Sequence, residues 1–112
     1  MNIELFREYC LRKKEVSESF PFDESTLVFK VMNKMFAATG IEPFYRVNLK
    51  CDPEQALELR ANYNAVQPGY HMNKKHWNTI VVNDDLLYEL IDHSHDQVVS
   101  KLTRKQQNEL RV

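Results

Sequence analysis

The sequence of 112 residues predicts one α+β domain, spanning residues 1–112, in which helices cover one face of an antiparallel sheet. Stretches with helical spacing of apolar residues stand near both ends and in the middle, and stretches with two-residue alternation are grouped between them. The length suits a single domain, which most often has roughly 100–150 residues. With only two glycines and four prolines, the chain has little material for long linkers. The predicted order of elements is α-β-β-β-α-β-β-α.

The first predicted element is a helix over residues 2–14. Asn2 is a good N-cap, and Phe6 and Cys10 share one face at helical spacing. Because a residue before proline avoids the helical region, Phe20-Pro21-Phe22 predicts an extended connection after this helix.

Three strands are expected next, over residues 26–31, 35–39 and 44–50. The first two are separated by Asn33-Lys34, which is short enough for a hairpin turn. The third strand alternates, so one set of side chains is expected to be buried and the other exposed. The expected outer set is basic and polar and consists of Arg46, Asn48 and Lys50.

Capping signals mark the remaining helices. Asp52 followed by Pro53 predicts a helix start, with Ala56, Leu59 and Tyr63 on the buried face. A loop over residues 64–76 leads to a strand over residues 77–83. A long helix then follows, which Asp84 or Asp85 caps and which runs to about residue 101; its apolar stripe is Leu87, Ile91, Ser94, Val98 and Leu102. Thr103 and Gln106 form a capping box for a short final helix.

The charge balance argues against a strongly basic nucleic-acid-binding protein, because 15 basic and 16 acidic residues give a net charge of −1. Residues 26–83 nevertheless carry seven basic and four acidic side chains, a balance of +3. Two cysteines do not make a disulfide framework, and no segment approaches the ~20 apolar residues of a membrane span. The N-terminus also lacks the apolar run of a signal peptide, so a cytoplasmic protein without membrane association is expected.

The segment PGYHMNKKHWNT at residues 68–79 concentrates side chains suited to nucleic acid. Lysine and histidine are donors for phosphate, tyrosine and tryptophan offer faces for stacking, and asparagine can pair with a base edge. The candidates in this segment are Tyr70, His71, Asn73, Lys74, Lys75, His76, Trp77 and Asn78. The outer residues of the third strand, Arg46, Asn48 and Lys50, extend the same candidate surface. The alternative interpretation is structural: the two aromatic rings pin the loop to the sheet, and the charged groups are only solvated.

Metal binding and catalysis find little support. His93 and His95 are two residues apart, which on a helix points them about 200° apart. No acid–base motif frames Cys51 with His71 or His76, and the two glycines exclude a glycine-rich phosphate loop. We therefore predict no catalytic residue, no metal and no cofactor.

Four blocks in order carry a resemblance to a known family: FPFDESTLVFKVMNKMFA, RVNLKCDPE, PGYHMNKKHWNT and ELIDHSHDQVV. The chain closely resembles the MmcQ/YjbR family of small bacterial proteins over roughly residues 2–110. The resemblance implies a fold similar to that of type III secretion chaperones. It also implies DNA binding through a "double wing" arrangement, whose wings would correspond to residues 44–50 and 66–79.

Three functional hypotheses follow. The first is a DNA-binding protein, whose few clustered cations predict weak, salt-sensitive binding. The second is a protein-interaction or chaperone-like module with an unknown protein partner and no nucleic acid, anchored by the aromatic candidates Tyr70 and Trp77. The third is an enzyme of unrecognised type, which requires a closed pocket that unites His71, His76 and Cys51.

Overall fold

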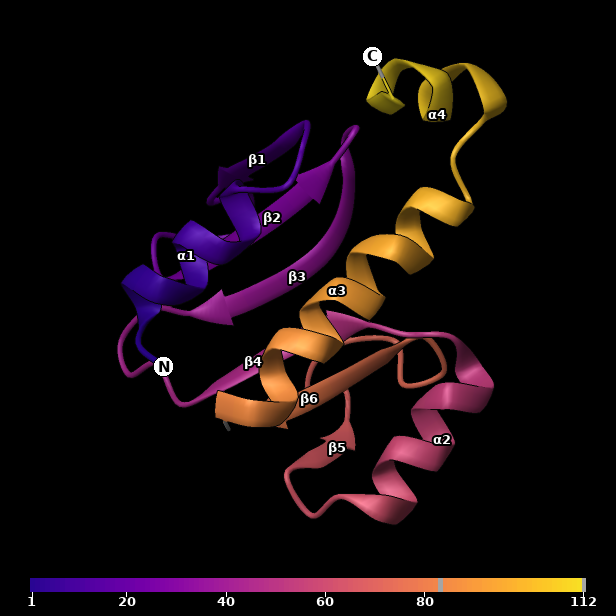
Figure 1. The fold of residues 1–112 in the computed structure, drawn as a ribbon. Helices are drawn as coiled ribbons and strands as arrows, with labels where there is room; N and C mark the ends of the chain where they lie inside the picture. The colour runs from indigo at the N-terminus through magenta and orange to yellow at the C-terminus, as the bar shows by residue number, and fades with distance from the viewer. Residues whose placement is uncertain (83, 112) are drawn as a thin grey trace.

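In the computed structural model, which describes residues 1–82 and 84–111, a six-stranded antiparallel sheet has its strands in the order β1-β2-β3-β4-β6-β5. Figure 1 shows α1 and α3 lying across this sheet, with α2 beside its β5–β6 end. The α+β class and the antiparallel sheet are confirmed.

Four helices and six strands make up the described chain. Their bounds are α1 Ile3–Leu11, β1 Val16–Ser19, β2 Thr26–Val31, β3 Lys34–Gly40, β4 Arg46–Lys50, α2 Pro53–Asn62, β5 Val66–Pro68, β6 Trp77–Val81, α3 Asp84–Ser100 and α4 Arg104–Arg111. Asn2 caps α1 and Asp52 caps α2, as predicted. The side chains of Asp84 and Asp85, the predicted caps of α3, lie outside the described part.

The main departure from the predicted order is β1, an edge strand that the sequence pattern did not reveal. The helix expected to reach residue 14 ends at Leu11, and Glu15 adopts a positive φ of 60° before the strand begins. The four residues of β1 are mostly polar, so they lack the alternation that marks a strand. Glu18 of β1 accepts a 2.8 Å hydrogen bond from Arg7 Nε, which ties the strand to α1.

The β2–β3 turn lies one residue earlier than predicted. Met32 and Asn33 have φ values of 47° and 70°, and a two-residue turn with positive φ at both positions matches the twist of the strands that it joins. Lys34 is therefore the first residue of β3 rather than a turn residue, and its side chain stands at the end of the sheet.

The core lies between the sheet and the helices. Phe6 of α1 meets Phe29 of β2 edge-on, with ring centres 5.5 Å apart. The predicted stripe of α3 is buried along its whole length, and Ser94 within it donates a hydrogen bond to the carbonyl oxygen of Phe36. Tyr63 is exposed, contrary to the prediction, because it follows α2 as its C-cap with an extended backbone.

Because helices cover one face, alternate residues of the strands point away from them on what we call the outer face. On β4, Val47 and Leu49 are buried toward the helices, whereas Arg46, Asn48 and Lys50 point outward, as predicted. Among the described residues, no helix is long and apolar enough to cross a membrane.

Candidate functional site

The segment between β5 and β6 is a folded loop held by its own hydrogen bonds. Gly69 donates from its backbone nitrogen to the carbonyl oxygen of Trp77 at 3.0 Å, and Lys74 Nζ donates to the carbonyl oxygen of Gly69 at 3.1 Å. Asn73 Oδ1 accepts from the backbone nitrogen of Lys75 at 2.9 Å. Asn73 and one donor of Lys74 are therefore used to shape the loop, although both side chains are exposed.

Arg60 of α2 joins this loop to the helix layer. Its guanidinium donates to Asn78 Oδ1 at 2.7 Å, to the carbonyl oxygen of Trp77 at 3.2 Å, and to the carbonyl oxygen of Lys74. Sequence reasoning missed Arg60, because only the contact between α2 and β6 gives it this role.

Asn78 does not belong to the predicted surface. It is 1% exposed, points toward the helices and donates from Nδ2 to the carbonyl oxygen of Ala56 at 3.4 Å. Successive strand residues face opposite sides, so Trp77 on the outer face requires Asn78 on the inner one. Because side chains alternate between the two faces of a strand, the sequence of residues 77–79 was enough to place Trp77 and Asn78 on opposite faces.

The other predicted residues fall into two hollows. Tyr70 and His71 line a cavity with Arg46 and Asn48, which we call the aromatic cavity. A second group, Lys50, Lys75, His76 and Trp77, lines what we call the lysine cavity. The predicted contact surface is thus divided between two sites.

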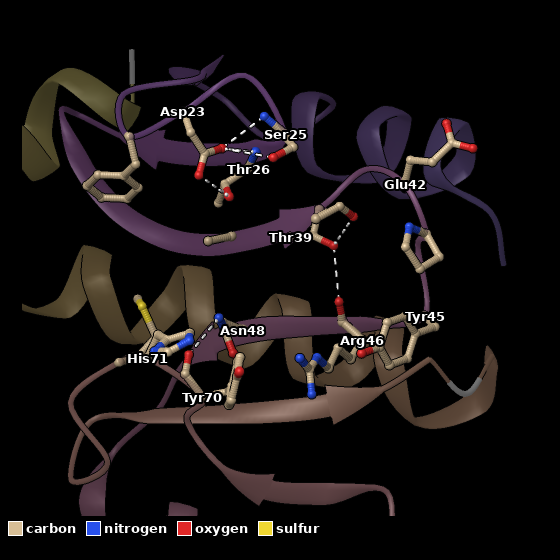
Figure 2. A pocket seen from close by; sticks show the side chains of 15 residues that line it. Asp23, Ser25, Thr26, Thr39, Glu42, Tyr45, Arg46, Asn48, Tyr70 and His71 are labelled. Carbon is tan, nitrogen blue, oxygen red and sulfur yellow. Dashed lines mark hydrogen bonds between the residues drawn. The ribbon is translucent and has the colours of Figure 1, made fainter.

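The aromatic cavity measures about 610 Å³ and lies over β3 and β4. The guanidinium carbon of Arg46 is 4.3 Å from the ring centre of Tyr70 and 5.0 Å from that of Tyr45. Figure 2 shows these three residues among those that line the cavity. Both tyrosines are about half exposed. Cation–π contacts of this kind hold a guanidinium in place while its edge stays open to a ligand.

Asn48 is already engaged beneath these rings. Its Nδ2 donates to the carbonyl oxygen of Tyr70 at 3.4 Å, and its Oδ1 accepts from the hydroxyl of Thr79. The same hydroxyl accepts from the backbone nitrogen of Tyr70 at 2.7 Å. Asn48 therefore positions Tyr70 rather than offering a free amide.

The opposite wall of the aromatic cavity is acidic (Figure 2). Asp23 accepts hydrogen bonds from the backbone nitrogens of Ser25 at 2.9 Å and Thr26 at 2.7 Å. Hydrogen bonds from Ser25 and Thr26 lower the pKa of Asp23, so its carboxylate is charged at neutral pH. Glu42 also lines this cavity, so the aromatic cavity combines the positive charge of Arg46 with acidic side chains.

The lysine cavity measures about 630 Å³ and is bounded by four separate parts of the fold. Lys34 begins β3, Lys50 ends β4, Lys75 lies in the β5–β6 loop, and Lys101 follows α3. Within the described part of the chain, none of these four lysines forms an ion pair. Their charges are therefore not neutralised by ion pairs within that part of the chain.

Asp52 is the only described acidic residue that lines the lysine cavity, and its carboxylate already accepts a 3.2 Å hydrogen bond from the Gln55 nitrogen as the cap of α2. Trp77 is 5% exposed, and Lys50 Nζ lies 5.4 Å from the centre of its indole ring. The indole thus forms part of the wall, and a lysine covers its face.

Sequence reasoning missed Lys34 and Lys101. Both are exposed lysines that stand apart from the candidate segment at residues 68–79, and nothing in their local sequence distinguishes them from solvated charges. They meet Lys50 and Lys75 only because the β2–β3 hairpin and the end of α3 reach the same end of the sheet.

The residues that an enzyme hypothesis requires are not brought into one pocket. His71 lines the aromatic cavity, His76 lines the lysine cavity, and Cys51 is buried. Burial, together with the charge of Asp52, raises the pKa of the Cys51 thiol to about 11, which is the reverse of an activated nucleophile. Among the described residues, no group of three or more histidine, cysteine, aspartate or glutamate side chains is placed to share a metal ion.

Comparisons with known proteins agree with the sequence resemblance. A family model described as YjbR matches residues 11–97. The uncharacterized protein YjbR of Escherichia coli strain K12 is 34% identical over 107 residues, which cover 91% of each chain. The uncharacterized protein YbdF of Escherichia coli O157:H7 is 34% identical over 116 residues, which cover 96% of this chain and 93% of YbdF.

Solved structures match along the same length. The crystal structure of protein DR2400 of Deinococcus radiodurans superposes with a TM-score of 0.88 at 40% identity, covering 99% of this chain and 88% of DR2400. A solution NMR structure of a Pseudomonas syringae protein has a TM-score of 0.68 at 25% identity, covering 87% of this chain and 92% of the other.

Proposed function

This chain belongs to the YjbR family, and from that premise we propose that it binds DNA weakly through the outer face of its sheet and the adjoining β5–β6 loop. The observation that carries the proposal is a set of cations on this side that form no ion pair with any other described residue. They are Arg46, Lys50 and Lys75.

These cations supply the electrostatic part of binding. Lysine and arginine that neutralise phosphates release counterions, so affinity falls as salt rises. Three cations predict a slope of log affinity against log salt no steeper than about −2.7 on duplex DNA. Because the whole chain has a net charge of −1, long-range repulsion opposes this attraction. We expect a dissociation constant near 10⁻⁴ M at physiological salt, at the weak end of non-specific binding.

Tyr45 and Tyr70 supply the apolar part. Their half-exposed rings frame the Arg46 guanidinium at the rim of the aromatic cavity. Aromatic rings beside a cationic strip are the usual platform for unpaired bases, and each stacked base is worth about 1–3 kcal/mol. The proposal therefore extends to single strands. Trp77 has no part in stacking, because it is buried beneath Lys50.

Fluorescence anisotropy with a labelled duplex and a labelled single strand, over a salt series, tests the proposal. The double variant Lys50→Glu/Lys75→Glu is expected to abolish binding. Arg12→Glu/Lys14→Glu is the matched control, since it makes the same change of net charge at exposed residues beyond the end of α1. Circular dichroism establishes that both variants fold.

Two results would overturn the proposal. One is the absence of binding to either probe at low salt. The other is equal loss in the variant and the control, which would show that only net charge matters.

A specific observation also favours the protein-interaction alternative. Phe22, Tyr45 and Tyr70 expose aromatic rings around the aromatic cavity, whose mixed charge suits a polypeptide better than a phosphate backbone. A pull-down from lysate with and without nuclease separates the alternatives. Partners that persist after nuclease and are lost in Tyr70→Ala support this alternative.

A further inference from the structure

We propose that the lysine cavity is a binding site for a compact polyphosphate group, such as free tripolyphosphate or the phosphate chain of a nucleotide. The inference does not depend on DNA binding. Two of the four lysines, Lys34 and Lys101, lie outside the β4 strand and the β5–β6 loop, and the proposed ligand occupies the concave site rather than the open surface.

The shape of the site suits a small ligand. Its volume of about 630 Å³ falls within the roughly 300–1,000 Å³ of small-molecule pockets. The residues that line it come from β3, β4, the loop before β6 and the end of α3, so lysines from four separate parts of the fold border one hollow. A duplex surface makes better use of a flat array of cations, whereas a converging set surrounds a compact charge.

The charge of the site suits an anion with several negative charges. Four lysines line the cavity with a single described carboxylate, that of Asp52, which already caps α2. An ammonium is a point charge with three rotatable donors, and it binds phosphate without demanding a fixed planar geometry. Among the described residues, no arginine lines this cavity, so ammonium groups alone would hold the phosphates.

The wall strengthens the attraction. Val98 and Leu102 of the helical stripe and the buried Trp77 line the cavity beside the lysines. Charges interact more strongly near such apolar surface than in open water, because the effective dielectric constant is lower. Bringing four like charges together also costs energy in the unliganded protein, and a polyanion relieves that repulsion.

The site recognises phosphate and not a base. The indole face that would stack on a base is covered by Lys50, with Nζ 5.4 Å from the ring centre. The other described lining residues offer no exposed aromatic ring apart from the imidazole of His76. Tripolyphosphate and adenosine triphosphate should therefore bind with similar affinity, and inorganic phosphate, with less charge, much more weakly.

Isothermal titration calorimetry of the full chain at low salt, without divalent cations, tests this with three probes: tripolyphosphate, adenosine triphosphate and inorganic phosphate. We expect the first two to agree within about threefold. The variant Lys34→Gln/Lys101→Gln should lose at least tenfold in affinity for tripolyphosphate. Arg46→Gln is the control, since it removes a cation that lines only the aromatic cavity. Its affinity should stay within twofold of the unchanged protein.

A second measurement locates the ligand. The indole Nε1–H resonance of Trp77 should shift during the tripolyphosphate titration, and at the same ligand concentrations it should shift much less in the double variant. Because Lys34 and Lys101 are exposed, their replacement should leave the melting temperature without ligand almost unchanged. Failure of tripolyphosphate to bind the full chain would overturn the inference. So would unchanged affinity in the double variant, or a nucleotide that binds far more tightly than tripolyphosphate.

The DNA proposal and the polyphosphate proposal can be contradicted independently of each other. If tripolyphosphate binds and no DNA probe does, the cavity inference stands and the proposed function falls. If DNA binds and tripolyphosphate does not, the reverse holds.

Discussion

Arg60 Nε donates a 2.7 Å hydrogen bond to Asn78 Oδ1, and this pair fastens the β5–β6 loop to α2. The same guanidinium also reaches the carbonyl oxygens of Lys74 and Trp77. The loop that carries Tyr70 toward one cavity and Lys75 toward the other is thus held from the helix side of the sheet.

Arg60→Gln is expected to destabilise the protein by about 1–3 kcal/mol, the usual cost of leaving buried partners of a charged donor unsatisfied. Arg60→Lys should not restore stability, since one ammonium cannot match three acceptors that a planar fork spans. Urea denaturation measures the change, and Glu58→Gln, on an exposed position of α2, serves as control. A stable Arg60→Gln variant would mean that the loop holds itself.

Trp77→Ala is expected to cost about 3 kcal/mol or more, as for other large core truncations, because only 5% of Trp77 is exposed. Phe22→Ala is the comparison: its ring is 66% exposed, and surface changes usually stay within about 0.5 kcal/mol. Chemical denaturation followed by circular dichroism compares the two. Equal midpoints would contradict the burial of the indole.

Gly69→Ala tests how closely the loop approaches β6. An added Cβ would lie 2.9 Å from both Cβ and the carbonyl oxygen of Trp77 and 3.2 Å from Met72 Cβ, so the backbone must shift. We expect a loss of about 1–3 kcal/mol, typical of overpacking. At Gly40 the nearest atom is the Pro43 carbonyl oxygen at 3.8 Å, an ordinary contact, and Gly40→Ala should be nearly neutral. Thermal melts that fail to separate these two variants would refute the close approach.

His95 makes stability depend on mild acidity. Burial lowers the pKa of His95, the charge of Lys13 lowers it further, and interaction with Asp96 only partly opposes the change. The unfolded chain therefore takes up a proton at higher pH than the folded one. Stability should decline as pH falls below about 6.5, the ordinary histidine pKa, and continue to decline until the lower folded-state pKa is passed. Denaturation midpoints between pH 8 and pH 5 measure this, and His95→Gln should flatten the slope.

The Asp92 carboxylate affects stability only at a lower pH than His95 does. Burial by itself would raise the pKa of Asp92, but hydrogen bonds from Lys13 and Tyr9 outweigh it and lower the pKa. The stability that these two hydrogen bonds add is present above the ordinary aspartate pKa and is lost as pH falls below it. A decline in the free energy of unfolding that begins near pH 6.5 is therefore assigned to His95 rather than to Asp92.

Local chemistry determined most of the secondary structure. Asn2 and Asp52 cap helices, and Thr103 and Gln106 exchange the hydrogen bonds of a capping box, at 3.2 Å and 3.1 Å. These features depend on residues three or four positions apart, and so does the buried stripe of α3. The amino-acid order therefore predicts them without knowledge of the fold. Edge strand β1 was not predicted, because its pairing with β2 and not its own composition makes it a strand.

The sequence by itself also determined that cations and aromatic rings concentrate near residues 46–50 and 68–79. Only the tertiary structure decided how they are distributed. It turned Asn78 inward to Arg60, buried Trp77, and placed Tyr70 beside Arg46. It also brought Lys34 and Lys101 to Lys50 and Lys75, from elements distant in the chain. The physical reason is that strand alternation assigns a side chain to a face, while strand order and helix packing decide which remote residues share that face.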